Sequence, residues 1–155
     1  MTNDYNDKPR CAWINDPLMR LYHDEEWGVM LHDDRKLFEF MVLDAFQAGL
    51  SWKTILNKRE NFRTAFDNFE PELIAGYNEE KYEQLLADTG IIRNRAKIRA
   101  TITNAIAFLE VQKEFGSFDK YIWSLVDYHP IINSWHSLSE IPPKTGISDL
   151  VSKNL

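Results

Sequence analysis

The chain has 155 residues, a formal net charge of −6 and a sequence pI of about 5.2. Hydrophobic residues make up 44% of it and aromatic residues 13%, which suffices for one sizeable core, so a single domain is expected. The acidic balance excludes a protein that holds nucleic acid by bulk positive charge, and any DNA-binding surface has to be local. The aromatic content favours a binding pocket.

Targeting signals are not evident. No stretch approaches the roughly 20 apolar residues that span a bilayer, and the first residues lack the apolar run of a signal peptide. Cys11 is the single cysteine, so no internal disulfide can form. We expect a cytoplasmic protein without a membrane partner, with a flexible tail at residues 1–9 and one helical domain at residues 10–155.

Capping residues divide the chain into helices, and no convincing alternating strand occurs, so the predicted fold class is all-α. Asp33 or Asp34 can cap a core helix over residues 36–48 that stops at Gly49. The further helices are expected after Ser51, from Pro71, after Asn78, from Asn94 to near Gly116, after Ser117 and after Ser148. A loop with little regular structure is expected from Pro130 to Pro143.

The helix after Ser148 reaches Leu155 within fewer than about two and a half turns and without a stop signal. Two interpretations stay open, a frayed natural end and a shortened chain, and we favour the second.

Asp44 falls among apolar residues of the predicted core helix, including Phe40 and Met41. A carboxylate there is costly unless it is paired, hydrogen-bonded or used in chemistry. The alternative is that Asp44 lies at the edge of the polar strip formed by Lys36, Glu39 and Gln47, where it meets solvent or caps a neighbouring helix.

Aromatic residues flank this helix in the sequence, namely Trp13, Tyr22, Trp27 and Trp52. Flat electron-rich rings near a carboxylate form a good receptor for a planar cation, although each ring taken alone is more often a core residue.

Basic residues follow a predicted turn at Gly90 and face a single acid, Asp88; they are Arg93, Arg95, Lys97 and Arg99. Free N–H groups at such a turn and helix start suit a DNA phosphate, while an ordinary solvated helix face is the alternative. A weaker cluster that could extend this surface comprises Lys53, Lys58, Arg59 and Arg63.

Cys11 and His23 are residue types that bind zinc, but a structural zinc site needs four ligands. The other histidines, His32, His129 and His136, show no pairing with a further ligand. On the residues alone, Cys11 is better interpreted as an ordinary buried thiol.

Five motifs occur in a characteristic order: CAW at 11–13, YHDEEWG at 22–28, QAGLSW at 47–52, KREN at 58–61 and GIIRNRAKI at 90–98. Together they closely resemble the bacterial DNA-3-methyladenine glycosylase I family, and the resemblance runs from Arg10 to the end of the chain. It implies a helix-hairpin-helix fold that flips a damaged nucleotide out of double-stranded alkylated DNA.

The resemblance also implies roles for individual residues. The hairpin positions that would grip the DNA backbone are Gly90, Ile91, Arg93, Arg95 and Lys97. Ile92 replaces the second hairpin glycine, so this hairpin is a degenerate form.

The pocket positions are Tyr22 and Trp52, which would bind the base, and Trp13 and Trp27, which would form the wall. Asp44 stands where the family has Glu and is the candidate catalytic residue; Phe46 stands where the family has Gln. The shorter Asp44 is expected to reach the base only through water.

The resemblance also implies a zinc site, in which Cys11 and His23 match one pair of ligands. A second His/Cys pair is expected beyond Leu155, so zinc should bind weakly or not at all to this chain. The function implied is hydrolytic excision of 3-methyladenine in base excision repair, by a monomer. Two alternatives stay open, a non-enzymatic helix-hairpin-helix DNA-binding module and a binder of free methylated purines.

Overall fold

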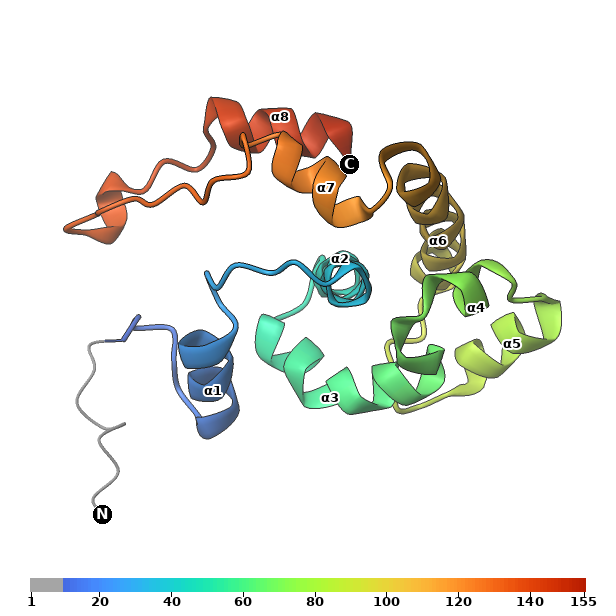
Figure 1. Ribbon diagram of the computed structural model, residues 1–155. Helices are drawn as coiled ribbons and strands as arrows, with labels where there is room; N and C mark the ends of the chain where they lie inside the picture. Colours follow the sequence, from blue (N-terminus) through green and yellow to red (C-terminus); the bar gives the residue numbers. More distant parts are fainter. Residues whose placement is uncertain (1–9) are drawn as a thin grey trace, which may run out of the picture.

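A central helix, α2 (Asp34–Gln47), is surrounded by the other helices in the computed structural model, which describes residues 10–155 (Figure 1). The fold is all-helical, as predicted. The tail expected at residues 1–9 lies outside the described residues. No helix within residues 10–155 is both long enough and apolar enough to cross a membrane.

Most predicted helix starts are confirmed by their capping hydrogen bonds. The Asp33 side chain accepts from the Lys36 amide at 2.8 Å at the start of α2, and Ser51 caps α3 (Trp52–Ala65) through the Thr54 amide. The same holds for Asn78 at α5 (Glu79–Ala87), Asn94 at α6 (Arg95–Phe115) and Ser117 at α7 (Phe118–Ser124). Helix α4 (Pro71–Ala75) begins at Pro71, as predicted, but without a side-chain capping hydrogen bond.

The structure differs from the sequence analysis at both ends. Helix α1 (Pro17–Glu25) was not predicted, although Asp16 caps it and Pro17 occupies its first turn. The prediction that Ser148 caps the last helix is wrong, because Thr145 caps α8 (Gly146–Asn154). The Thr145 hydroxyl accepts from the Ser148 amide, and the Ser148 hydroxyl accepts from the Thr145 amide. The preceding loop holds one short 3₁₀ turn, η3 (Leu138–Glu140).

The core is built around phenylalanines that are completely buried: Phe38, Phe46, Phe62, Phe66 and Phe69. The rings of Phe46 on α2 and Phe62 on α3 meet edge to face with 4.8 Å between centroids, which fixes the two helices against each other. Each such burial contributes roughly 1.5–3 kcal/mol. Phe46 is therefore a core residue rather than part of a polar pocket.

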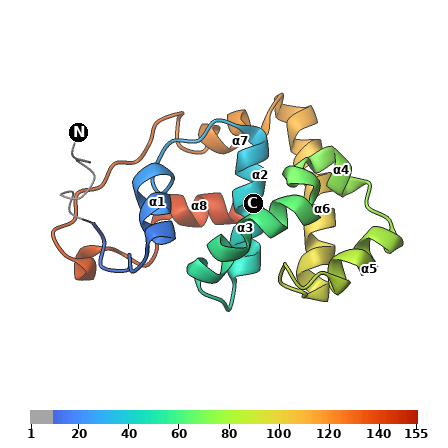
Figure 2. The same ribbon diagram turned by 90° about the horizontal axis from the view of Figure 1, so that it is seen from below.

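Helix α3 lies between two groups of helices, with α1 on one side and α4, α5 and α6 on the other (Figure 2). Helix α3 packs against α1 and α2 and reaches the turn between α5 and α6 through hydrogen bonds from Lys58 and Asn61 to the Gly90 carbonyl. Helix α6 packs against α2, α4, α5 and α7. Helices α7 and α8 lie on the opposite side of α2 from α3 (Figure 1), where the Tyr121 hydroxyl donates to the Asn154 carbonyl at 2.6 Å. The position of α3 sets the geometry of the site.

Candidate functional site

A groove of about 770 Å³ lies between α1, α2 and α3. Its lining includes Tyr22 from α1, Glu26 just after α1, Phe40 and Asp44 from α2, and Arg59 from α3. Residues from separate parts of the sequence therefore share one concave surface, of the size that small-molecule sites have.

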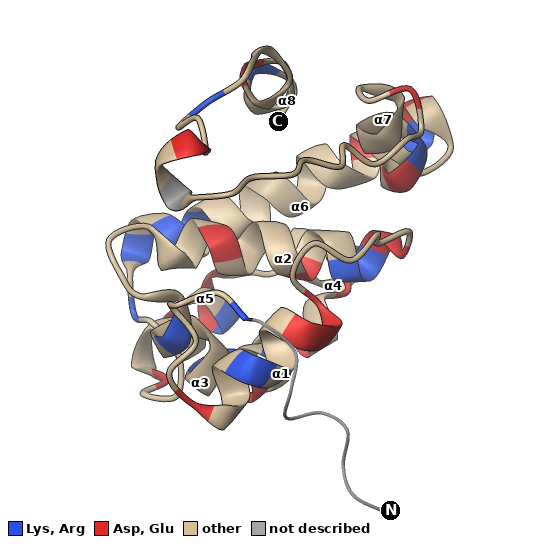
Figure 3. Ribbon diagram, turned by 90° about the vertical axis from the view of Figure 1, so that its left-hand side faces the viewer, with Lys and Arg blue, Asp and Glu red and all other residues tan. Residues whose placement is uncertain are grey.

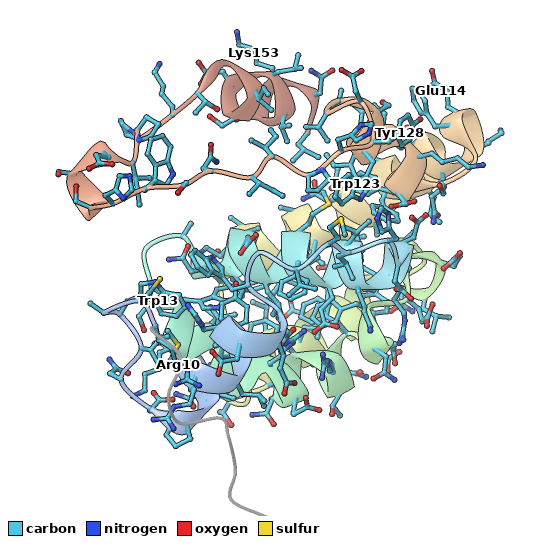
Figure 4. The ribbon with its side chains drawn as sticks, turned by 60° about the vertical axis from the view of Figure 1, so that its left-hand side comes forward. Arg10, Trp13, Glu114, Trp123, Tyr128 and Lys153 are labelled. Carbon is cyan, nitrogen blue, oxygen red and sulfur yellow. The ribbon has the colours of Figure 1, made fainter. Side chains whose placement is uncertain are left out.

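The aromatic residues predicted to bind and enclose a base form a continuous cluster beside this groove. Tyr22 lies 5.4 Å from Trp52 and 6.5 Å from Trp13, measured between ring centroids. Trp13 meets Trp27 edge to face at 5.5 Å, and His23 stacks on Trp27 at 5.3 Å. Trp13, labelled in Figure 4, lies at the α1 end of the molecule, away from Trp123 and Tyr128.

Three members of the cluster keep unused capacity for a ligand. The Trp52 indole N–H is buried beside Tyr22 without a hydrogen bond of good geometry to any group within residues 10–155. Trp13 and Trp27 are 37% and 50% exposed, which is unusual for such large apolar side chains. The cluster thus combines a buried inner part with an open outer wall.

Asp44 faces this groove without an ion-pair or hydrogen-bond partner among the described residues. Burial by its surroundings raises the pKa of its carboxyl above the usual value, although the residue keeps exposed surface. Burial, followed by the nearby Asp44 charge, also raises the pKa of the Tyr22 hydroxyl. An unpaired carboxylate beside electron-rich rings is a suitable receptor for a cation.

Glu39, which the alternative interpretation of Asp44 places in a polar strip, does not lie on a solvated face. Its side chain is buried, and its Oε1 accepts from Arg59 Nε at 2.5 Å and from Arg63 Nη2 at 2.8 Å. Arg59 Nη1 also donates to Glu26 at 2.7 Å, and Arg63 Nη1 to Glu60 at 2.6 Å. These ion pairs join α3 to α2 and to the end of α1, beside the groove.

The weak cluster of basic residues on α3 consequently does not form a free cationic surface. Besides the two arginines, Lys53 pairs with Asp16 at 2.7 Å, and the Lys58 ammonium donates to backbone carbonyls of the hairpin. Figure 3 shows acidic and basic residues side by side over α1 and α3. The suggestion that this cluster extends a DNA surface is therefore not supported by the geometry.

The predicted turn at Gly90 connects α5 to α6 and is held from two directions. The Asp88 side chain accepts from the Gly90 amide at 2.7 Å. Lys58 Nζ donates to the carbonyls of Thr89 and Gly90 at 3.2 and 2.9 Å, and Asn61 Nδ2 donates to the Gly90 carbonyl at 3.3 Å. A Cβ at Gly90 would lie 3.0 Å from Asp88 Oδ1 and 3.2 Å from Asn61 Cβ, which is tighter than ordinary van der Waals contact, so a larger residue here would force these neighbours to shift.

Beyond the turn, Ile91 is 3% exposed and anchors the hairpin in the core. The amide N–H groups of Ile92 and Arg93 donate to no acceptor within residues 10–155. They lie directly before the N-terminus of α6, where backbone donors and the helix dipole favour an anion.

The predicted phosphate-binding side chains divide into two groups. Arg93 is exposed and has no ion pair within the described range. Arg95 has one long ion pair, with 3.7 Å between its Nη1 and Glu83 Oε1, and both side chains are exposed. Lys97 instead donates to the carbonyls of Phe46 and Ala48 at 2.9 and 2.6 Å, so it caps the C-terminus of α2. Of the three side chains, Arg93 and Arg95 are the two that are not used to cap another helix.

Cys11 and His23, the two zinc ligands that the family resemblance implies, are not joined by further ligands within residues 10–155. His23 Nδ1 is 2.9 Å from Asp24 Oδ1, and Arg10 holds the same carboxylate, which lowers the pKa of Asp24. No group of three or more His, Cys, Asp or Glu side chains within residues 10–155 is arranged to hold a metal ion. Two residues do not suffice for a structural zinc site, which needs four ligands.

Comparison with known proteins identifies this arrangement. The family model described as methyladenine glycosylase matches residues 13–155. The chain belongs to this family. It is 48% identical over 147 residues to DNA-3-methyladenine glycosylase 1 of Escherichia coli K12, covering 94% of this chain and 79% of the relative. It is 42% identical to the DNA-3-methyladenine glycosylase of Haemophilus influenzae, covering 94% and 80%.

Solved structures of methyladenine glycosylases have the same fold. A crystal structure of 3-methyladenine DNA glycosylase I matches with a TM-score of 0.89 at 50% identity, covering 94% of this chain and 81% of the other. A structure of the Staphylococcus aureus enzyme, described as the structural basis of 3-methyladenine recognition, matches with a TM-score of 0.87 at 33% identity, covering 91% and 75%.

For this member of the methyladenine glycosylase family, sequence reasoning missed the residues that support the site. The capping pair Asp16 and Pro17 could have revealed α1, which carries Tyr22. The links from Arg59 to Glu26 and from Lys58 to the hairpin had no signal in the sequence beyond their charges, because the partners lie 33 and 32 positions away.

Proposed function

We propose that this chain is a base-excision repair enzyme that removes 3-methyladenine from alkylated double-stranded DNA by hydrolysis of the N-glycosyl bond. The observation that carries the proposal is the unpaired Asp44 carboxylate in the groove beside the Tyr22–Trp52 pair. The family relationship supports the same reaction, since the relatives are named DNA-3-methyladenine glycosylases.

In the proposed reaction the flipped base stacks on Trp52, and Tyr22 and Asp44 interact with its edge. Methylation at N3 gives the purine a positive charge, which the Asp44 carboxylate and the aromatic rings stabilise. A water oxygen bonds to C1′ of the sugar as the C1′–N bond breaks, and the bonding electrons leave with the purine and cancel its charge. The attacking water releases one proton to solvent and becomes the hydroxyl group at C1′. Because the base is already a good leaving group, recognition supplies much of the selectivity.

Asp44 is one methylene shorter than the glutamate that the family pattern has at this position. Its exposed surface leaves room for solvent at the carboxylate. A water molecule that bridges Asp44 and the base would restore the contact at little cost in free energy.

The DNA backbone binds at the hairpin in this proposal, through the free amides of Ile92 and Arg93 and the side chains of Arg93 and Arg95. One such site per chain serves one flipped base, so the enzyme acts as a monomer, in the cytoplasm where bacterial DNA lies. Zinc would be held by Cys11 and His23 together with ligands outside the described residues, and weakly without them.

The test is release of free 3-methyladenine from methylated duplex DNA, measured by chromatography with a no-enzyme control for spontaneous depurination. We expect release by the wild-type chain and at least a tenfold slower release by a folded Trp52→Ala variant. Binding of flipped DNA without release would favour the non-enzymatic DNA-binding module. Binding of free base without any DNA binding would favour the small-molecule binder.

A further inference from the structure

The KREN motif at residues 58–61 contains no residue of the proposed reaction, yet its side chains connect to both halves of the site. Lys58 and Asn61 are three positions apart on α3 and therefore share one face of the helix. Both donate to the carbonyl of Gly90, in the hairpin. Arg59, on a different face, binds Glu26 at the end of α1.

We propose that this motif positions the two halves of the site separately, with Lys58 setting the DNA-binding hairpin and Arg59 setting the base pocket. This inference rests on the proposed function and deepens it. It assigns positioning roles to Lys58, Arg59 and Glu26, which act through the hairpin and through α1.

The Lys58 ammonium group donates hydrogen bonds to the carbonyls of both Thr89 and Gly90, at 3.2 and 2.9 Å. The two carbonyl groups therefore point toward α3. The amides of Ile92 and Arg93, next along the chain, remain without acceptors within residues 10–155. Ile92 stands where the superfamily hairpin has a second glycine, so a side-chain clamp takes over part of the role that backbone freedom has elsewhere.

Arg59 acts on the other half of the site. Its guanidinium is 12% exposed and binds Glu39 of α2 through Nε and Glu26 through Nη1, at 2.5 and 2.7 Å. The Glu26 amide in turn donates to the Tyr22 carbonyl at 2.9 Å. Arg59 thereby fixes the end of α1, and with it Tyr22, relative to the helix that carries Asp44.

The two roles predict opposite effects for two variants. Lys58→Met keeps the length of the side chain but removes the donor, while Glu26→Gln releases α1 and leaves Arg59 paired with Glu39. DNA affinity is measured by fluorescence anisotropy with a labelled unmodified duplex. Base affinity is measured by quenching of tryptophan fluorescence with free 3-methyladenine.

We expect Lys58→Met to weaken DNA binding about tenfold and to leave base binding within about twofold of wild type. We expect Glu26→Gln to weaken base binding about fivefold and to leave DNA binding within about twofold. Lys58→Arg, which retains the donors, should restore DNA affinity to within about threefold. Equal losses of both affinities in each variant, or no loss in either, would overturn the inference.

Hydrogen–deuterium exchange separates this inference from the proposed function, because it needs no ligand. Faster exchange should be confined to peptides covering residues 88–94 in Lys58→Met and to peptides covering residues 17–28 in Glu26→Gln. If the wild-type chain bound neither probe, the proposed function would fail. The local exchange pattern would still support separate positioning of the hairpin by Lys58 and of α1 by Arg59. Exchange that rises throughout the chain, or in neither segment, would refute it.

Discussion

Substitution of Glu39 by glutamine should destabilise the fold strongly, although the change is isosteric. Glu39 Oε1 accepts charge-assisted hydrogen bonds from both Arg59 and Arg63, and its side chain is 7% exposed. Breaking a buried ion pair by removing one partner costs about 3–5 kcal/mol. Arg59 keeps Glu26 and Arg63 keeps Glu60, so we expect a value near the lower limit, about 3 kcal/mol.

The matched control is Glu60→Gln, which removes a carboxylate from the same Arg63 but at a position where the side chain is 81% exposed. Its cost should stay below about 1 kcal/mol. Urea unfolding followed by tryptophan fluorescence gives both free energies of unfolding, and the Tm of Glu39→Gln should fall by about 6–12 °C. Free energies of unfolding that agree within about 0.5 kcal/mol for the two variants would refute the view that Glu39 anchors α3 to α2.

Further predictions concern the pocket and the hairpin. Because burial raises the pKa of Asp44, the excision rate should fall on acidification at a higher pH than an ordinary aspartate would give, and Asp44→Asn should be slow without this acid limb. The ionised form is the disfavoured one in the folded state, so Asp44→Asn should melt no lower than wild type at neutral pH. Gly90→Val should lower both the Tm and DNA affinity, because its Cβ meets Asn61, whereas Gly146→Ala, whose Cβ meets nothing within 4 Å, should change neither; equal effects would contradict this packing. Arg93→Gln should reduce the slope of log K against log salt by about 0.9 for duplex DNA, and an unchanged slope would exclude Arg93 from phosphate contact.

Local signals in the sequence predicted most of the helix boundaries. Asp33, Ser51, Asn78, Asn94 and Ser117 cap their helices because a short polar side chain can bond to an amide three positions ahead. That interaction depends on neighbouring residues only. The prediction of a cap at Ser148 failed because Thr145 provides an equivalent cap one turn earlier, and the two residues form a reciprocal pair.

The contacts that build the site were harder to predict, since they depend on how helices cross. The sequence places Glu39 on the same side of its helix as polar residues, and only the packing of α3 brings Arg59 and Arg63 over it. Lys97 illustrates the same limit, because its position after the hairpin suggests a phosphate contact while the C-terminus of α2 occupies its ammonium. The aromatic residues were singled out by their positions around the core helix, and the family resemblance gave them their pocket roles. Nothing in the sequence shows that Trp13 and Trp52 both lie beside Tyr22.

A protein with a net charge of −6 can bind a polyanion at the hairpin if the basic groups there are not neutralised by acidic neighbours. The basic residues of α3 are neutralised by Asp16, Glu26, Glu39 and Glu60 or used on hairpin carbonyls, so they add little to a long-range field. Under the proposed function, the donors that the hairpin offers to DNA at the start of α6 are the amides of Ile92 and Arg93 and the side chains of Arg93 and Arg95. Few ionic contacts mean modest non-specific affinity and a shallow salt dependence. In the proposed function, discrimination then comes from the pocket, where we expect the unpaired Asp44 to favour a cationic base over a neutral one.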